Sequence, residues 1–182
     1  MVKKNLAFIL CAALGLFTFI FSAFTCVACD VDDFAFSGYG IFGDDFEILK
    51  NLEISGVTGV ITAVQVLMLV VGVLMLIWGV LGVIKGMFGK LNQFPDAIGR
   101  VKTSLIAKIM LVVMAALNVL QLIFLLVFVS DLNSGIGEMG FDFAIGFGII
   151  LALILTVLAA VAAFVVDILF GKEEVATPAE EK

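Results

Sequence analysis

The amino-acid sequence predicts an all-α membrane protein, a bundle of four transmembrane helices. Of its 182 residues, 63% are hydrophobic and only 14% are charged, and the mean hydropathy is +1.28. Soluble globular proteins are far less apolar. The apolar residues form four runs, each long enough for the roughly 20 helical residues that cross a hydrocarbon core about 30 Å thick. We expect one transmembrane domain over 1–170, with helices at about 6–29, 57–84, 105–129 and 143–170.

The charged residues between these runs predict the orientation of the helices. Bases precede the first run and separate the second from the third, whereas acids dominate the other two links. Basic loops stay on the cytoplasmic side. We therefore expect a plasma-membrane protein with both termini in the cytoplasm and with a charged cytoplasmic tail at 171–182. The bases are Lys3, Lys4, Lys85, Lys90, Arg100 and Lys102, and the acids of the last link are Asp131, Glu138 and Asp142.

The first run has one alternative interpretation, a cleaved secretory signal. Two lysines precede it, and Val27-Ala28-Cys29 is similar to a lipoprotein cleavage site. The run is, however, longer than the roughly 7 to 15 apolar residues of a signal peptide. In addition, Cys26 stands three residues before Cys29, where such sites have an aliphatic residue. We predict that 6–29 is retained as a span.

Small residues in the second run predict a face that packs against another helix. The glycines recur at intervals of 7, 3 and 4 residues, which is the 3.5-residue period of a helix face in a left-handed bundle. In lipid, where little hydrophobic force acts between helices, small residues let two backbones approach closely. The glycine seam is Gly72, Gly79, Gly82 and Gly86, and similar stripes occur in the first run (Cys11, Gly15, Thr18, Ser22) and the fourth (Gly148, Ala152, Ala159, Ala163).

A few polar residues within the runs predict contacts between helices. Counting along the helices puts Gln65 at the depth of Asn118 and Gln121, so we expect an amide contact, Gln65 to Gln121 above all. Lys108 and Asp167 fall at matching depth near the cytoplasmic boundary, where pairing would relieve the cost of an isolated charge. We interpret both groups as structural, because a permeation path needs more polar lining. A small channel or transporter with a midplane polar site is the alternative.

The two acidic links share a glycine motif. Twelve residues from position 37 align without gaps on twelve from position 134, with seven identities at an offset of 97 residues, which predicts a tandem repeat of helix–loop–helix units. Both copies contain G-x-G-x-x-G, but neither follows a strand in a βαβ unit, so nucleotide binding is rejected. We expect the glycines to adopt positive φ in turns and the aspartates to cap helix starts. The motif residues are Ser37, Gly38, Gly40, Gly43 and Asp45 in the first copy, and Ser134, Gly135, Gly137, Gly140 and Asp142 in the second.

Catalytic chemistry has one candidate in this sequence. There is no histidine, which excludes His-based catalysis and His-ligated metal or haem. Cys26-Val27-Ala28-Cys29 has the C-x-x-C spacing of thiol–disulfide exchange, and in position it resembles the disulfide-generating quinone reductases of bacterial membranes, which are four-helix proteins. The second outer cysteine pair of that family would fall near 131–142, where this chain has no cysteine. A membrane thiol oxidoreductase is therefore the third functional alternative.

Other four-span families offer an outline but no signature. Claudins and tetraspanins share the predicted topology, but the single tryptophan, Trp78, lies inside the second run, and there is no Cys-Cys-Gly. The chain resembles the uncharacterised small four-span bacterial membrane proteins whose first outer loop carries Ser-Gly-x-Gly-x-x-Gly, here Ser37 to Gly43. That resemblance implies no activity. We expect a non-enzymatic protein without cofactor or metal, whose role is structural assembly or partner binding, with membrane lipid, a second copy or another membrane protein as partner and no nucleic acid.

Overall fold

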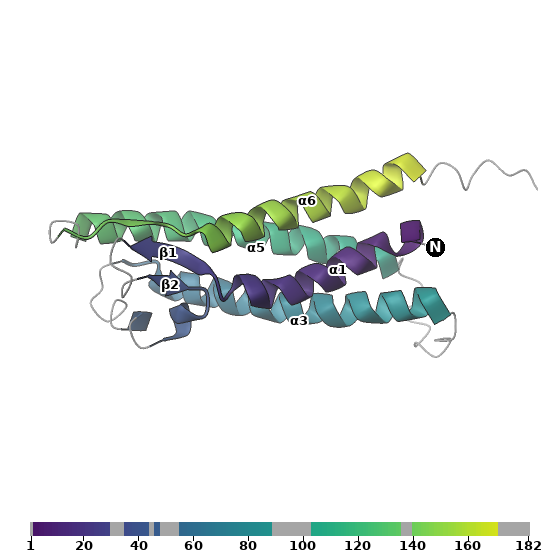
Figure 1. Cartoon of the computed structure of the whole chain (residues 1–182), viewed down its shortest axis with the longest axis horizontal. Coiled ribbons are helices and arrows are strands. Elements are labelled where there is room, and N and C mark those ends of the chain that lie inside the picture. The colour runs from purple at the N-terminus through teal and green to yellow at the C-terminus, as the bar shows by residue number, and fades with distance from the viewer. Residues whose placement is uncertain are drawn as a thin grey trace, which may run out of the picture.

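The computed structural model describes the backbone at 2–29, 35–43, 46–47, 55–88, 103–135 and 140–170, and side chains at 6–29, 35–43, 46–47, 55–84, 105–135 and 140–165. Four long helices dominate these residues: α1 (Val2–Phe21), α3 (Thr58–Phe88), α5 (Thr103–Gly135) and α6 (Phe147–Phe170). Helices consecutive in the chain run in opposite directions (Figure 1). Contacts join α1 to α3, α3 to α5, α5 to α6 and α6 back to α1, so the four helices surround a common interior.

A small antiparallel sheet lies at the end of the helices opposite the N-terminus (Figure 1). Its strands are β1 (Thr25–Cys29), β2 (Phe36–Ser37) and β3 (Phe143–Ile145), in the order β2-β1-β3. Val27 pairs with Ile145 and Cys29 with Phe143, while β2 and the 3-10 helix η2 (Gly40–Phe42) follow on the other side of β1. The sheet therefore joins the segment after α1 to the segment just before α6.

This sheet corrects two predicted helix boundaries. The sequence predicted helix over 6–29 and from 143 onward, but α1 ends at Phe21 and α6 begins at Phe147. A short apolar run has the composition of a buried strand as well as of a helix. Thr25 and Val27 are β-branched and suit a strand, and β1 gains hydrogen-bonded partners along both edges. The partner strands, which are distant in sequence, decide the outcome.

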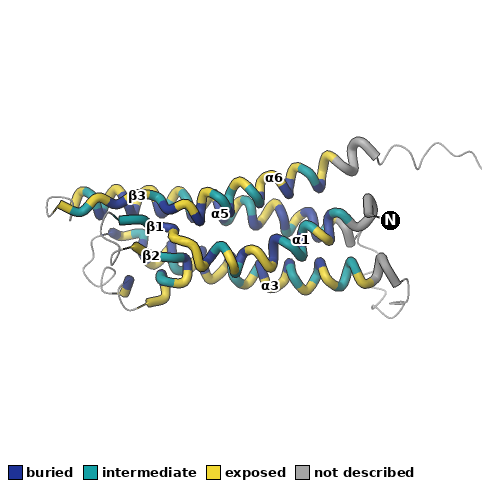
Figure 2. The backbone as a smooth tube through the Cα atoms, viewed as in Figure 1, coloured by how far each residue is buried: buried dark blue, intermediate teal, exposed yellow. Residues whose placement is uncertain are grey.

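The interior contains two apolar clusters, which follow one another along the helix axes. The inner cluster lies away from the sheet and includes Cys11, Met75, Leu111 and Met114, each with no exposed surface. The outer cluster lies against the sheet. It combines Val27, Phe36, Phe46, Ile61, Leu125, Phe128, Leu132 and Phe143 with further apolar residues. In Figure 2, buried and exposed residues alternate along each helix, as expected of helices that turn one side toward a common interior.

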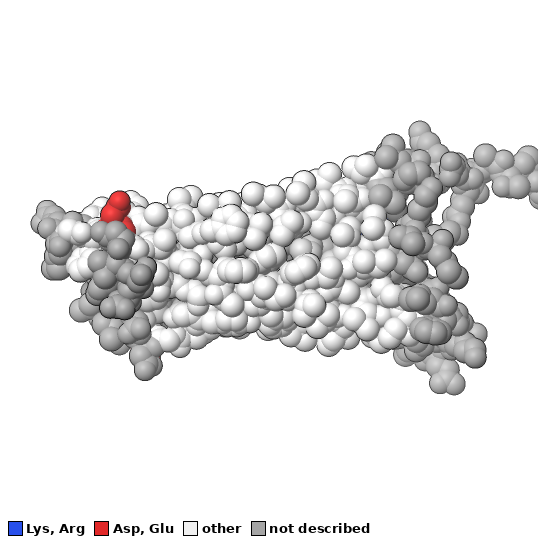
Figure 3. Space-filling view, in the orientation of Figure 1, with Lys and Arg blue, Asp and Glu red and all other residues white. Residues whose placement is uncertain are grey.

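The outward faces of the helices are apolar too. Three helices are long and apolar enough to cross a membrane, with candidate spans at Thr58–Ile84, Leu105–Gly135 and Phe147–Val165, and a shorter apolar stretch occupies Leu6–Phe21 in α1. Only 22 to 39% of the residues in the three apolar windows are buried. In the space-filling view the described surface between the two ends is uncharged, and the coloured atoms are acidic and lie at the sheet end (Figure 3).

The glycine seam of α3 packs against α1. A Cβ atom on Gly79 would contact the backbone N of Ala12 and come within 2.7 Å of its Cα, and one on Gly72 would lie 3.2 Å from the Cβ of Thr18. The contact is reciprocal, because a Cβ on Gly15 of α1 would lie 2.5 Å from the backbone N of Leu76. The surroundings of Gly86, the last glycine of the predicted seam, lie outside the described part of the chain. At this seam the two backbones touch.

We predict that Gly79→Ala destabilises the protein by about 1–3 kcal/mol, because the new methyl group must push the α1 backbone away. Thermal unfolding in detergent measures the effect. Gly59→Ala is the matched control in the same helix, since nothing lies within 4 Å of a Cβ there. Gly82→Ala should also destabilise the protein, because its Cβ would overlap the ring of buried Phe8, Cγ included, and turning the ring about its own axis does not move Cγ. Equal stability of the Gly79→Ala and Gly59→Ala proteins would contradict this packing.

The side chain of Asn133 holds β3 against α5. Its Nδ2 donates to the carbonyl oxygen of Phe143 at 2.9 Å, and its Oδ1 accepts from the backbone N–H of Phe143, also at 2.9 Å. One side chain thus satisfies both backbone groups of a buried strand residue, as a neighbouring strand would.

Asn133→Ala should therefore cost about 1–3 kcal/mol, since it leaves a buried donor and a buried acceptor without partners. Unfolding by heat or denaturant in detergent gives the value. The adjacent Ser134→Ala is the control, because the Ser134 hydroxyl is exposed and its described hydrogen bond, to the carbonyl oxygen of Ser130, stays within its own helix. A cost for Asn133→Ala no larger than that for Ser134→Ala would show that this hydrogen-bonded pair does not hold β3.

Candidate functional site

A layer of polar side chains separates the inner and outer apolar clusters. All its members are buried, and every one of the four helices, or the turn that follows it, contributes. We call this set the polar layer. It consists of Thr18 and Ser22 from α1 and the turn after it, Gln65 from α3, Asn118 and Gln121 from α5, and Thr156 from α6.

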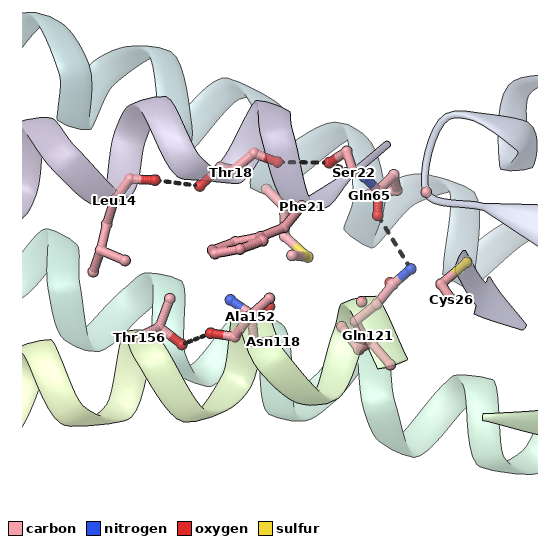
Figure 4. Close-up of a pocket in the computed structure, with 14 residues that line it drawn as sticks. Leu14, Thr18, Phe21, Ser22, Cys26, Gln65, Asn118, Gln121, Ala152 and Thr156 are labelled. Carbon is pink, nitrogen blue, oxygen red and sulfur yellow. Dashed lines mark hydrogen bonds between the residues drawn. The ribbon is translucent and has the colours of Figure 1, made fainter. Parts of the chain in front are cut away.

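A chain of hydrogen bonds runs through the polar layer from α5 to α1 (Figure 4). The Nε2 of Gln121 donates to Oε1 of Gln65 at 3.4 Å, and the Nε2 of Gln65 donates to Oγ of Ser22 at 3.0 Å. The hydroxyl of Ser22 then donates to the carbonyl oxygen of Thr18 at 2.8 Å. The sequence predicted the contact between the two glutamines, and the structure places their amides together. It did not predict that Ser22 is the next acceptor.

Gly38 closes the polar layer on the sheet side. A Cβ atom at this position would lie 3.0 Å from the Cα of Ser22 and 3.1 Å from Nε2 of Gln65. The backbone N–H of the next residue, Tyr39, donates to the carbonyl oxygen of Ser22 at 2.9 Å. The first loop therefore folds back over the glutamine network, and the residue in contact with the network has no side chain.

A cavity of about 30 Å³ lies within the polar layer. Two buried side-chain oxygens in its lining, Oδ1 of Asn118 and Oε1 of Gln121, accept no hydrogen bond from the protein. The Nδ2 of Asn118 donates to the carbonyl oxygen of Met114 within the same helix. The fourteen lining residues are all uncharged: Leu14, Thr18, Phe21, Ser22, Cys26, Gly38, Gln65, Met68, Asn118, Gln121, Gly148, Ile149, Ala152 and Thr156.

The cavity is not at the midplane of the apolar surface. Exposed large apolar side chains on α5 extend from Leu105 to Val127, a length of about 33 Å along the helix axis. Asn118 and Gln121 lie about 3 and 8 Å from the centre of this band, and α5 runs toward the sheet end (Figure 1). The polar layer therefore lies in the half of the band nearer the sheet.

The inner half of the molecule contains the predicted basic group. Lys108 is 5% exposed, and its Nζ lies 5.5 Å from the centre of the Phe164 ring on α6, a distance at which a cation is attracted to the face of a ring. Asp167, the partner predicted for Lys108, belongs to α6, but its side chain lies outside the described residues. The ring contact does join α5 to α6 at the predicted depth.

The two copies of the glycine motif, which begin at Ser37 and Ser134, differ in local structure. Ser37 belongs to β2, whereas Ser134 and Gly135 end α5. The motif glycines were expected to have positive φ. In the described part of the chain only Gly140 does, with φ +91°, whereas Gly43 has φ −87°. Gly137 and Asp45 lie outside that part.

The two copies do share one buried phenylalanine at equivalent positions. Phe46 and Phe143 are 2% and 3% exposed and belong to the same outer cluster, although Phe46 is helical and Phe143 is in β3. The expectation that Asp142 caps a helix is wrong, because β3 follows it and α6 starts only at Phe147. Gly40 is in η2 and allows a close turn on Ser37, whose Oγ accepts from the Gly40 backbone N–H at 2.9 Å.

The structure places the C-x-x-C residues on a strand, and this opposes a role in thiol exchange. Cys26 and Cys29 are three residues apart in β1, so their side chains leave opposite faces and their Cα atoms are about 10 Å apart, too far for a disulfide. Cys26 is buried, and its Sγ donates to the carbonyl oxygen of Phe36 at 3.2 Å. Burial raises the pKa of the Cys26 thiol to about 12, whereas thiol exchange needs the thiolate.

Cys26 should therefore resist maleimide at pH 7–8 in the folded protein and react once the protein is unfolded in sodium dodecyl sulfate. The sign follows from the raised pKa, because the reactive thiolate is scarce below it. A background with Cys11→Ala and Cys29→Ala isolates this thiol, and Glu47→Cys, at an exposed position, provides the fast-reacting control. Fast labelling of native Cys26, matching that of the control, would restore the oxidoreductase alternative.

The fold and the polar layer together indicate a class of protein, the integral membrane proteins, rather than a named family. Three helices are long and apolar enough to span a membrane, apolar side chains cover their outward faces, and a small polar layer is buried between them. These are features of a membrane protein. No protein-family model, no curated protein and no solved structure matches this chain.

Proposed function

We propose that this chain is a multi-pass plasma-membrane protein with four spans and both termini in the cytoplasm, and that it acts through assembly or partner binding rather than catalysis. The observation that carries the proposal is the apolar outer surface. At most 39% of the residues in each candidate span are buried, so most of these apolar side chains face outward along three helices. An exposed apolar surface of that extent needs lipid or protein to cover it.

The packing of α1 supports its role as the fourth span. Its apolar stretch, Leu6–Phe21, is about 24 Å long, and Lys3 and Lys4 in the turn before it would lie at the membrane surface. It covers the glycine seam of α3, which would otherwise be exposed, and β1 directly after it is the central strand of the sheet. Cleavage before Cys29 would cut β1 itself and remove the helix that α3 packs against. These contacts favour a retained helix over a secretory signal.

The distribution of charge along the chain supports the orientation. Lys3 and Lys4 are in the first turn of α1, and the basic link 89–102 connects the end of α3 to the start of α5. These three helix ends lie opposite the sheet (Figure 1). Asp131, Asp142 and Glu47 are at the sheet end. By the positive-inside rule, the sheet then faces outward.

Single cysteines introduced into a Cys11→Ala, Cys26→Ala, Cys29→Ala background test this topology in intact cells. Glu47→Cys and Ser134→Cys should react with a membrane-impermeant maleimide from outside, whereas Gln93→Cys should react only after the membrane is permeabilised. The cysteine-free protein must first retain the thermal stability of the wild type. External labelling of Gln93→Cys, or protection of Glu47→Cys, would invert or break the proposed topology.

The interior supports cohesion as the role of the polar groups. Gln121, Gln65 and Ser22 form one hydrogen-bonded chain that ends on the carbonyl oxygen of Thr18. The inner cluster beyond them is packed with residues such as Met75 and Leu111 that have no exposed surface. What remains available to other molecules is the outer surface. Copurification from mild detergent, followed by cross-linking and native mass spectrometry, tests this role. Detection of the 19.4 kDa protomer alone, with bound lipid but without a second copy or another protein, would contradict assembly.

Transport is the second candidate, and the cavity is the observation that favours it. Asn118 and Gln121 present oxygen atoms there without protein partners. A solute flux into proteoliposomes that is lost in Gln121→Leu, while the folded protein persists, would favour transport. The apolar inner cluster, which fills the path toward the basic end, argues for the assembly role instead.

A further inference from the structure

We propose that the cavity in the polar layer is a binding site for two water molecules, which complete the hydrogen bonding between α5 and the other helices. The proposal starts from two atoms. Oδ1 of Asn118 and Oε1 of Gln121 are buried, belong to residues each only 1% exposed, and accept no hydrogen bond from the protein. Leaving such an acceptor without a partner destabilises the folded protein, and both residues line the same cavity (Figure 4).

The lining also offers hydrogen-bond donors. Each of the amides of Gln65, Asn118 and Gln121 has two N–H groups, and the hydrogen bonds described above use one from each. The hydroxyls of Ser22 and Thr156 donate to backbone carbonyls but keep free lone pairs. The cavity therefore presents donors and acceptors together. A ligand that can both donate and accept, as water does, matches this lining.

The size and the charge of the cavity argue against other classes of ligand. A buried water occupies roughly 10–15 Å³ by this measure, so about 30 Å³ has room for two. Organic solutes are too large. A cation would meet amide N–H groups, an anion would meet amide oxygens, and neither would find an opposite charge among the lining residues to offset the cost of leaving water.

The two waters would give Gln121 and Asn118 a connection that direct contacts do not supply. Gln121 already reaches Gln65 of α3, but the described hydrogen bonds give neither amide of α5 a direct link to Thr156 of α6 or Thr18 of α1. A bridging water costs little entropy and makes hydrogen bonds nearly as favourable as direct ones. The waters would thus join the polar side chains of all four helices into one network.

Radiolytic footprinting of the full-length protein in detergent tests the proposal. X-ray pulses generate hydroxyl radicals from bound water, and these oxidise the methionine sulfur they reach first. Met68 and Met75, two turns apart on α3, both belong to the inner cluster, but of the two only Met68 lines the cavity, so Met75 is the matched control. Both are buried, with exposures of 5% and 0%. We expect Met68 to be oxidised several-fold faster than Met75.

Two variants connect the oxidation to the cavity. Ala152→Leu fills the space, and Asn118→Leu removes an acceptor with little change of volume; in each, oxidation of Met68 should fall to the rate of Met75. If one variant does not fold, the other still decides. Equal rates for Met68 and Met75 in the wild type would overturn the proposal, as would unchanged Met68 oxidation in the variants or binding of xenon in the cavity, since xenon prefers dry, apolar space. None of these outcomes bears on the topology, which the cysteine labelling tests separately.

Discussion

The close contact between α1 and α3 is the constraint on which the remaining structure depends. Glycines at 15, 72 and 79 let the two backbones approach until added methyl groups would clash. Only at this separation can the Gln65 side chain on α3 reach Ser22 just beyond the end of α1. The glycines thus do more than allow dispersion contacts, because they also set the distance over which the polar layer is bonded.

The sheet fixes the positions of the helices relative to one another at the end where α1 stops. α1 ends where Ser22 becomes part of the glutamine network, and the chain continues directly into the central strand of the sheet. β3 then aligns the start of α6 with that strand, and Asn133 ties β3 back to α5. Three helices are therefore held in register at this end, α1 and α6 through backbone hydrogen bonds of the sheet and α5 through the side chain of Asn133. In a molecule whose outer surface is apolar, such bonds and the polar layer supply directionality that apolar packing alone does not.

Much of the interior could be predicted from residue spacing. The glycine seam follows from a 3.5-residue period, and the meeting of Gln65 and Gln121 follows from depth along antiparallel helices, since the rise per residue is constant. Both predictions needed only helices of known direction. The strands could not be predicted in the same way, because Thr25–Cys29 and Phe143–Ile145 are too apolar to be distinguished from the helices beside them. Their pairing involves residues more than 100 positions apart, which no local pattern records.

The shared outer motif illustrates a further limit of sequence reasoning. Identical residues at a constant offset suggested equal structures, yet Ser37 is in a strand and Ser134 in a helix. Among the motif positions that the structure describes, the buried aromatics Phe46 and Phe143 are the pair that belongs to the same cluster. Their neighbours differ, because one copy folds back over the polar layer and the other runs into the sheet.

By itself, the sequence determined the apolar character of the helices, their order, the face of α3 that packs and the depth of the buried amides, since these follow from composition and helical periodicity. The tertiary structure alone decided where α1 and α6 end, that Ser22 completes the glutamine network, and that Cys26 and Cys29 point apart on a strand. It also decided that two amide oxygens face a common cavity. These features depend on contacts between segments far apart in the chain, whose energies exceed the local preferences that a sequence pattern expresses.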